Sequence, residues 1–123
     1  MQPSATQGAA YDPNGILVST KRTFTDTVTI ANGQNLAAGA VLGKVTADGK
    51  FVASDSGAAN GSQTPIAILA EACDASGGDK SAIIYLAGDF DQRKLTFAGA
   101  HTADTTRHDF AARGIYLHRS VAA

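Results

Sequence analysis

Residues 27–52 read TVTIANGQNLAAGAVLGKVTADGKFV, and this stretch decides the fold. Its β-branched and apolar residues are interrupted by Asn-Gly, Ala-Gly and Asp-Gly pairs, which favour tight turns between strands. The stretch contains no nucleophile beside a base, no set of metal ligands and no phosphate-binding loop. It therefore predicts a small β-rich module that binds by shape.

The same pattern continues on both sides of this stretch. Apolar runs bounded by Gly, Asp, Asn and Ser predict short extended segments at residues 27–31, 40–46, 50–52, 65–72, 81–86, 95–97 and 115–117. Gly43, inside the second of these segments, predicts a bulge or a close approach of two backbones. Residues 88–94 are expected to form a turn.

One helix is predicted, at residues 102–113. Thr102 or Asp104 can accept hydrogen bonds from the first-turn amides, Arg113 complements the negative end of the helix dipole, and Gly114 suits a left-handed stop. Many short strands are thus followed by one helix and a last strand. This order predicts a mainly β fold of the α+β class.

The composition favours a single domain with a thin core. The chain has 123 residues, of which 44% are hydrophobic and 7% aromatic, and it contains no Trp. Such a core gains stability from a partner or from self-association. The net charge of -1 argues against a nucleic-acid partner. Acids gather between Asp48 and Asp91 and bases after Arg93, so the two regions could meet in an oligomer or face a charged partner.

Cysteine content and hydropathy bound the compartment. Cys73 is the one cysteine, so no disulfide can form within the chain, and we expect a small buried residue. No apolar run approaches the ~20 residues that a membrane span needs, so no membrane partner is expected. The N-terminus lacks the basic and apolar regions of a signal peptide, which favours synthesis in a cytoplasm.

The first 22 residues differ from the rest of the chain. Residues 1–15 are rich in Gln, Ala, Ser, Gly and Pro and are expected to form an extended arm. Residues 16–18 are an apolar patch that can add as a strand to a sheet edge, either of this chain or of another. We therefore expect an N-terminal arm at residues 1–22 and a domain at residues 23–123.

The residues that could carry chemistry form no recognised site. The three histidines lack the spacing of a zinc motif, and Asp79 stands where a phosphate loop requires Gly. Asp89 and Asp91 could approach a calcium ion, but the other positions of an EF-hand loop are missing. Cys73 has no neighbouring group to orient a catalytic base. We expect no enzyme activity, no cofactor and no metal.

A series of short motifs occurs in a characteristic order. The motifs are TIANGQNL (29–36), GAVLGKVT (39–46), GKFV (49–52), NGSQTP (60–65), AILAE (67–71), GGDK (77–80), GDF (88–90) and RGIYL (113–117). This ordered series resembles the lambda-type head decoration protein family of tailed phages and prophages. The resemblance covers residues 23–121.

The resemblance implies a non-enzymatic capsid protein with a compact β-clip-like domain. It implies a homotrimer that binds the major capsid protein on the outer surface of the expanded head, at threefold and quasi-threefold positions. There the trimer would act as a cement protein that stabilises the virion against internal DNA pressure. The N-terminal arm would order on the capsid and pair with a capsid strand.

Two sets of residues are predicted to make these contacts. The predicted capsid-binding residues are Tyr11, Ile16, Leu17, Val18, Ser19 and Thr20. At the trimer interface, basic residues are predicted to meet acidic ones, and the four residues are Arg107, Arg113, Asp89 and Asp91.

Two other classes of function remain open. A different virion accessory protein or a carbohydrate-binding β-module would have a similar pattern of strands, although a chain without Trp is poorly equipped for sugars. A small hydrolase with a dispersed site is the second alternative.

Overall fold

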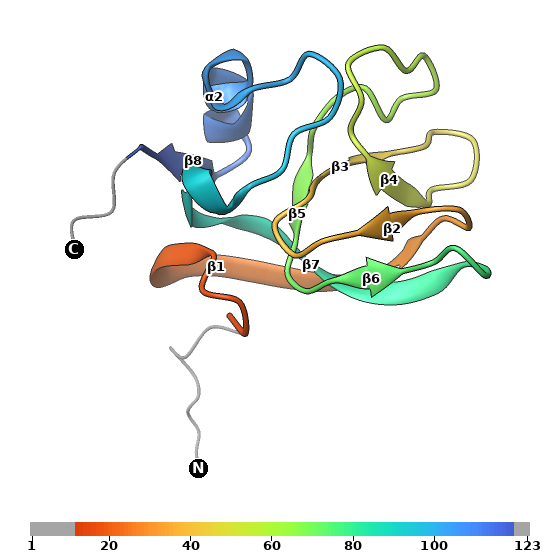
Figure 1. Ribbon diagram of the computed structural model, residues 1–123. Helices are drawn as coiled ribbons and strands as arrows, with labels where there is room; N and C mark the ends of the chain where they lie inside the picture. The colour runs from red at the N-terminus through yellow and green to blue at the C-terminus, as the bar shows by residue number, and fades with distance from the viewer. Residues whose placement is uncertain (1–11, 120–123) are drawn as a thin grey trace.

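The computed structural model describes residues 12–119, and at residues 19–22 it describes the backbone alone. The predicted mainly β fold with one helix near the C-terminus is confirmed (Figure 1). The elements in chain order are β1 (Leu17–Ile30), β2 (Asn35–Leu36), β3 (Val41–Lys44), β4 (Phe51–Ala53), β5 (Ala67–Leu69), β6 (Cys73–Asp74), β7 (Lys80–Asp91), the 3-10 helix η1 (Gln92–Lys94), α2 (Ala103–Ala112) and β8 (Ile115–His118).

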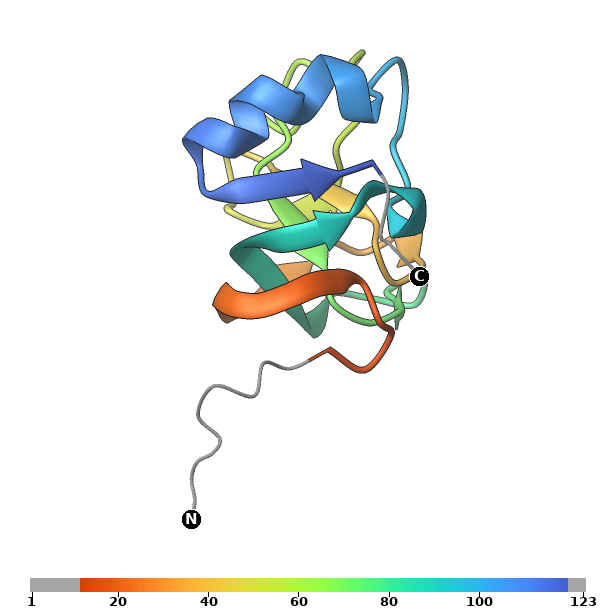
Figure 2. The ribbon, with the colours of Figure 1, turned by 90° about the vertical axis from the view of Figure 1, so that its left-hand side faces the viewer.

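Strand pairing closes most of the main sheet into a ring. Its six strands have the order β1-β4-β3-β5-β7-β8, and β1 also pairs with β7. The antiparallel β1–β7 ladder runs from Leu17↔Phe90 to Ile30↔Lys80, whereas β1 meets β4 in the single register pair Ile30↔Phe51. The ring is therefore well closed along β7 and nearly open between β1 and β4. β8 lies parallel to the end of β7, and Figure 2 shows β1, β7 and β8 side by side below α2.

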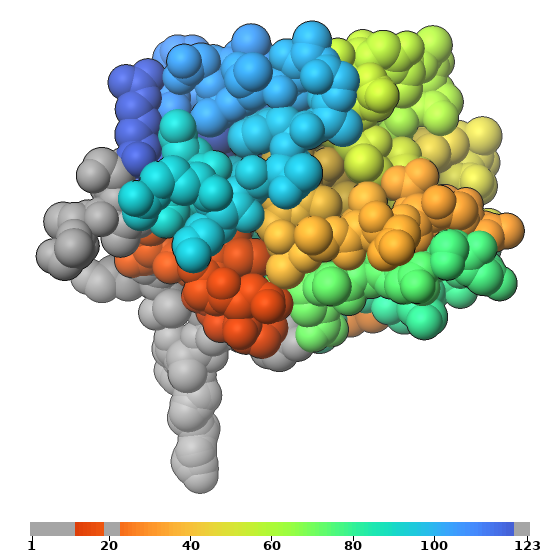
Figure 3. Space-filling view, in the orientation of Figure 1, coloured from red at the N-terminus to blue at the C-terminus, as the bar shows by residue number. Residues whose placement is uncertain are grey.

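Alternate residues of the central strands face two different hydrophobic cores. The sheet core, next to the small β2–β6 sheet, comprises Ile30, Ala40, Leu42, Phe51, Ala67, Leu69, Cys73, Ala75, Ala82 and Ile84. The helix core, next to α2, comprises Ile16, Val41, Ile68, Ala70, Tyr85, Phe90, Phe110, Ile115 and Leu117. Burial on both faces explains why β5 and the first three residues of β3 carry no polar side chain. Figure 3 shows β2 and β6 lying together across the front of the molecule.

Cys73 is a buried member of the sheet core, as predicted. Its thiol is free and 5% exposed, and burial raises the pKa of the Cys73 thiol above its usual value. A protonated thiol packed among apolar side chains behaves as a small hydrophobic residue.

Gly43 is a site of close backbone approach, which confirms the prediction from the sequence. A Cβ atom at this position would overlap the carbonyl group of Ser62. The loop around Ser62 therefore packs directly on β3, and only glycine leaves room for it.

The predicted helix is confirmed and has the predicted caps. The Thr102 hydroxyl accepts a hydrogen bond from the Thr105 N–H at 3.2 Å, and the Thr105 hydroxyl accepts one from the Thr102 N–H at 2.8 Å. This reciprocal pair is a capping box. Phe110 is fully buried against the sheet, and Gly114 ends the helix with φ +86°.

Two predicted boundaries differ from the structure. The turn expected at residues 88–94 begins only at Gln92, with η1, because β7 continues to Asp91. Gly88 has φ +153° and marks an irregularity within the strand, not its end. The strand expected at residues 27–31 begins already at Leu17, so β1 runs across the predicted boundary between arm and domain.

Candidate functional site

Asp12 fastens the segment that precedes β1. Its Oδ1 accepts a hydrogen bond from the Ile16 N–H at 2.9 Å and another from the Tyr85 hydroxyl at 3.3 Å. Its Oδ2 accepts a third from the Leu17 N–H at 3.3 Å. One carboxylate therefore joins the entry of β1 to the middle of β7. The sequence Asp-Pro-Asn-Gly at residues 12–15 is a turn signal that could have revealed this anchor.

Ile16 is part of the domain. Its side chain is 2% exposed and lies in the helix core, and its carbonyl accepts a hydrogen bond from the Asp91 N–H at 2.9 Å. The neighbouring Asn14 side chain donates to the Ala70 carbonyl at 2.9 Å. The apolar patch at residues 16–18 thus adds to a sheet edge of its own chain, one of the two options that the sequence left open.

The other predicted capsid-binding residues lie at the start of β1. Leu17 pairs with Phe90 and is half-buried, as is Val18. The backbone of Ser19 pairs with Asp89, and the backbone of Thr20 belongs to the same strand. Tyr11 lies outside the described residues. Whether any of these residues contacts a capsid remains a prediction.

The two acids predicted at the trimer interface are buried and engaged within the chain. Asp89 is 4% exposed, and its Oδ1 lies 3.1 Å from Nε2 of His118. Asp91 accepts hydrogen bonds from the backbone N–H and from Nε of Arg93, at 3.0 and 3.1 Å. These bonds lower the pKa of the Asp91 carboxyl and raise the pKa of the Arg93 guanidinium. Asp91 also caps the first turn of η1.

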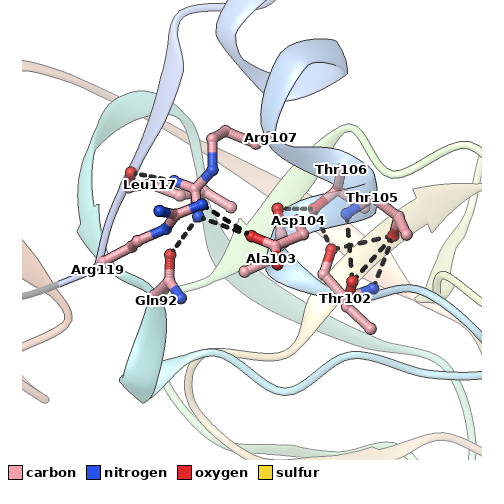
Figure 4. A network of polar contacts seen from close by, with 9 residues as sticks. All are labelled: Gln92, Thr102, Ala103, Asp104, Thr105, Thr106, Arg107, Leu117 and Arg119. Carbon is pink, nitrogen blue, oxygen red and sulfur yellow. Dashed lines mark hydrogen bonds and ion pairs between the residues drawn. The ribbon is translucent and has the colours of Figure 1, made fainter.

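Arg107 connects three elements of its own chain (Figure 4). One guanidinium nitrogen donates to the Leu117 carbonyl at 2.7 Å, and another donates to Oε1 of Gln92 at 2.6 Å. Asp104 lies 3.5 Å from Arg107 and 3.2 Å from Arg119. Arg107 therefore joins α2 to η1 and β8.

Arg113 is the exposed member of the predicted interface set. It forms the C-cap of α2 and borders a hollow of about 520 Å³ together with Thr64, Asp109 and Ala112. Within residues 12–119 the structure brings neither Arg107 nor Arg113 into an ion pair with Asp89 or Asp91. The predicted pairing was between subunits, and it remains a prediction.

The described residues contain no arrangement that suggests metal chemistry. No group of three or more His, Cys, Asp or Glu side chains in residues 12–119 is placed to hold a metal ion. His101 is instead used in packing, because its Nε2 lies 2.8 Å from the Gln63 carbonyl. Over the same residues, the one α-helix is too short and too polar to span a bilayer.

Comparison with protein families decides the class of the chain. The family model of the bacteriophage lambda head decoration protein D matches residues 5–115. The chain belongs to this family. No individual curated protein matches the sequence. As a member of this family, the protein is a structural component of the phage virion that associates with the capsid. The family match also confirms the resemblance noted from the sequence.

Proposed function

We propose that this head decoration protein forms a trimer that binds the outer surface of the expanded phage head at threefold and quasi-threefold positions. Bound there, it stabilises the shell against the pressure of the packaged DNA. The family match over residues 5–115 carries this proposal. After synthesis in the host cytoplasm, the protein would meet its partner, the major capsid protein, only when the shell has expanded.

The mechanism is cementing by preferential binding. A protein that binds the expanded shell and not the unexpanded one stabilises the expanded state by mass action. Three copies joined in one trimer bring three attachment points together, so the second and third bind at high effective concentration. Modest affinity at each point then gives firm attachment.

Residues 1–11 are the proposed capsid-binding arm, with Tyr11 as an aromatic anchor. The support is the position of Asp12, whose three hydrogen bonds fix the point from which this segment departs. Ile16 is buried in the helix core and so holds the chain that follows this arm against the domain. Ser19 and Thr20 remain proposed contacts. At the trimer interface, Arg113 is the proposed contact with the best access to a second copy.

Co-sedimentation with expanded and unexpanded capsids of the phage that carries this protein tests the proposal. The intact protein should pellet with expanded capsids alone, and a variant lacking residues 1–11 should lose most of its binding. This deletion spares Asp12 and Ile16, so we expect the domain to stay folded, which a urea unfolding curve of the truncated protein checks. Equal binding to both capsid states would contradict the cementing mechanism. A mass measurement on the free protein and on released complexes tests the trimer separately.

A further inference from the structure

One edge of β1 is largely free. β7 pairs with the opposite edge at Leu17, at Ser19 and at residues 24–30, whereas the Ala31 N–H donates to the Phe51 carbonyl at 3.0 Å where β1 meets β4. The register with β7 is unbroken from Thr25 to Ile30. Because alternate residues of a strand direct their backbone groups to the same side, those of Thr25, Thr27 and Thr29 lie on the β4 side.

Thr27 shows directly that this edge is not used in the β1–β7 ladder. Its N–H donates to Oδ1 of the adjacent Asp26 at 2.8 Å, and this hydrogen bond is exposed to solvent. A side chain that satisfies a neighbouring backbone N–H takes the place of a partner strand. An incoming strand can replace Asp26 with a carbonyl group.

A groove of about 500 Å³ lies beside this free edge, between β1 and the hairpin of β3 and β4. Its apolar lining consists of Val28, Phe51, Ile66 and Leu86, and its charged lining consists of Asp26, Lys44, Asp48 and Lys50. A free backbone edge above an apolar floor is what an extended peptide needs for strand addition: hydrogen bonds supply affinity, and alternate side chains supply specificity.

Leu86 lines this groove and lies at a β-bulge. Phe24 pairs with Ala87 and Thr25 pairs with Tyr85, so Leu86 is an extra residue in β7. Leu86 is 38% exposed, and Phe24, on the same face of β1 as Asp26, is 66% exposed. Two of the three large exposed hydrophobic residues in residues 12–119 therefore lie beside the free edge. Exposed apolar side chains gathered at one place mark an interaction site.

The other outer edge of the sheet is protected. In β8, the Leu117 carbonyl accepts a hydrogen bond from Arg107 at 2.7 Å, and α2 packs beside the strand. Natural proteins block sheet edges in this way to prevent unwanted pairing. The contrast between the two edges singles out β1 as the edge left available.

We propose that the groove binds an extended segment of the capsid protein, which adds as a strand to the free edge of β1. Its alternate apolar side chains would lie on the groove floor, and a basic side chain would lie near Asp26 and Asp48. Lys50 is already paired with Asp79 at 2.6 Å, so the groove has a net negative charge from two acids against Lys44.

This inference rests on the proposed function, because it takes the capsid protein as the partner. A second copy that pairs its own β1 with this edge fits less well. Such β1–β1 pairing is two-fold symmetric and would give a dimer, whereas the proposed assembly is a trimer.

Thr27→Pro and Thr27→Ala form a matched pair that tests the edge. Proline removes the N–H that a partner strand would use, but that N–H is outside the β7 ladder, so β1 should still form. Alanine keeps the N–H. We expect Thr27→Pro to weaken co-sedimentation with expanded capsids at least about tenfold, and Thr27→Ala to stay within about twofold, since one backbone hydrogen bond and its neighbours are disrupted.

Leu86→Asp and hydrogen exchange give independent readouts. Leu86→Asp places a carboxylate on the groove floor at a partly exposed position and should weaken binding by a similar factor. Hydrogen exchange by mass spectrometry on intact protein, free and on expanded capsids, should show slower exchange at residues 25–29 in the complex.

The possible outcomes separate this inference from the proposed function. Wild-type binding by both Thr27→Pro and Leu86→Asp, with unchanged exchange at residues 25–29, overturns the groove proposal. If deletion of residues 1–11 abolishes binding in the same experiment, the proposed function stands without the groove. Loss of the trimer in Thr27→Pro would assign the groove to a second copy and would also overturn the proposal. Failure of the intact protein to bind expanded capsids would overturn both.

Discussion

Replacing Ile16 by alanine tests whether the start of β1 belongs to the domain or to the capsid contact. The Ile16 side chain is 2% exposed and packs in the helix core with Tyr85 and Phe90. Truncating a buried isoleucine to alanine loses its transfer free energy and leaves a cavity, at a cost of about 2–5 kcal/mol. The hydrogen bond from the Asp91 N–H to the backbone of residue 16 is retained, so the cost reports on packing alone.

Urea and thermal unfolding measure this cost. A loss of about 3 kcal/mol in a domain of this size lowers Tm by about 10–15 °C and moves the urea midpoint down without changing the m-value. Capsid binding, measured well below the lowered Tm, should stay within about twofold of wild type, because the folded protein retains its surface. Phe24→Ala is the matched control for stability: its side chain is 66% exposed, and the change should stay within about 0.5 kcal/mol.

The opposite pattern would refute this reasoning. If Ile16→Ala unfolds at the same urea concentration as wild type but no longer binds expanded capsids, then Ile16 is a contact residue. The assignment of Ile16 to the helix core would then be wrong, and the prediction made from the sequence alone would be right.

Three further substitutions test other parts of the structure. Arg93 lowers the pKa of the Asp91 carboxyl, so this pair stabilises the fold at neutral pH and loses its contribution as the pH falls through the lowered pKa. The Asp91→Asn protein should therefore have a lower free energy of unfolding than wild type at pH 7, and that free energy should depend less on pH below about pH 4. Gly43→Ala forces a Cβ into the Ser62 backbone and should lower the free energy of unfolding by at least about 2 kcal/mol in urea, whereas little change would show that the loop can move away. Arg107→Lys cannot reproduce the two diverging hydrogen bonds of the guanidinium and should cost about 1–3 kcal/mol by the same assay; an unchanged midpoint would return Arg107 to the predicted trimer interface.

The sequence predicted the fold well where local signals are strong. The Asn-Gly and Asp-Gly turns, the caps of α2 and the close approach at Gly43 each depend on a few neighbouring residues, and each was found. The first half of β1 was not predicted as a strand, because residues 19–26 are mostly polar and include Lys21 and Arg22. That segment is extended because β7 pairs with it, and the paired residues of β7 lie 58 to 70 residues away along the chain.

The candidate site was harder to predict for the same reason. The anchor at Asp12 has a local signal, the Asp-Pro-Asn-Gly turn, but its bond to the Tyr85 hydroxyl depends on the ring being closed. The engagement of Asp91 by Arg93 is also local and could have been inferred from their spacing. By contrast, the edge of β1 is free because β4 pairs with it only at Ile30↔Phe51. No residue of β1 or β4 signals that they separate after the Ile30↔Phe51 pair.

The free edge of β1 is both a hazard and an advantage. An open strand edge invites pairing between copies, and charged side chains at the edge oppose it. Asp26 has this position, and its bond to Thr27 occupies the exposed amide until a partner displaces it. β1 is held on its other edge by β7 and at its start by Asp12, so a strand that adds to it meets a backbone already in the bound conformation. Binding at the proposed groove would therefore cost the decoration protein little ordering, which suits the groove to recognise the expanded capsid.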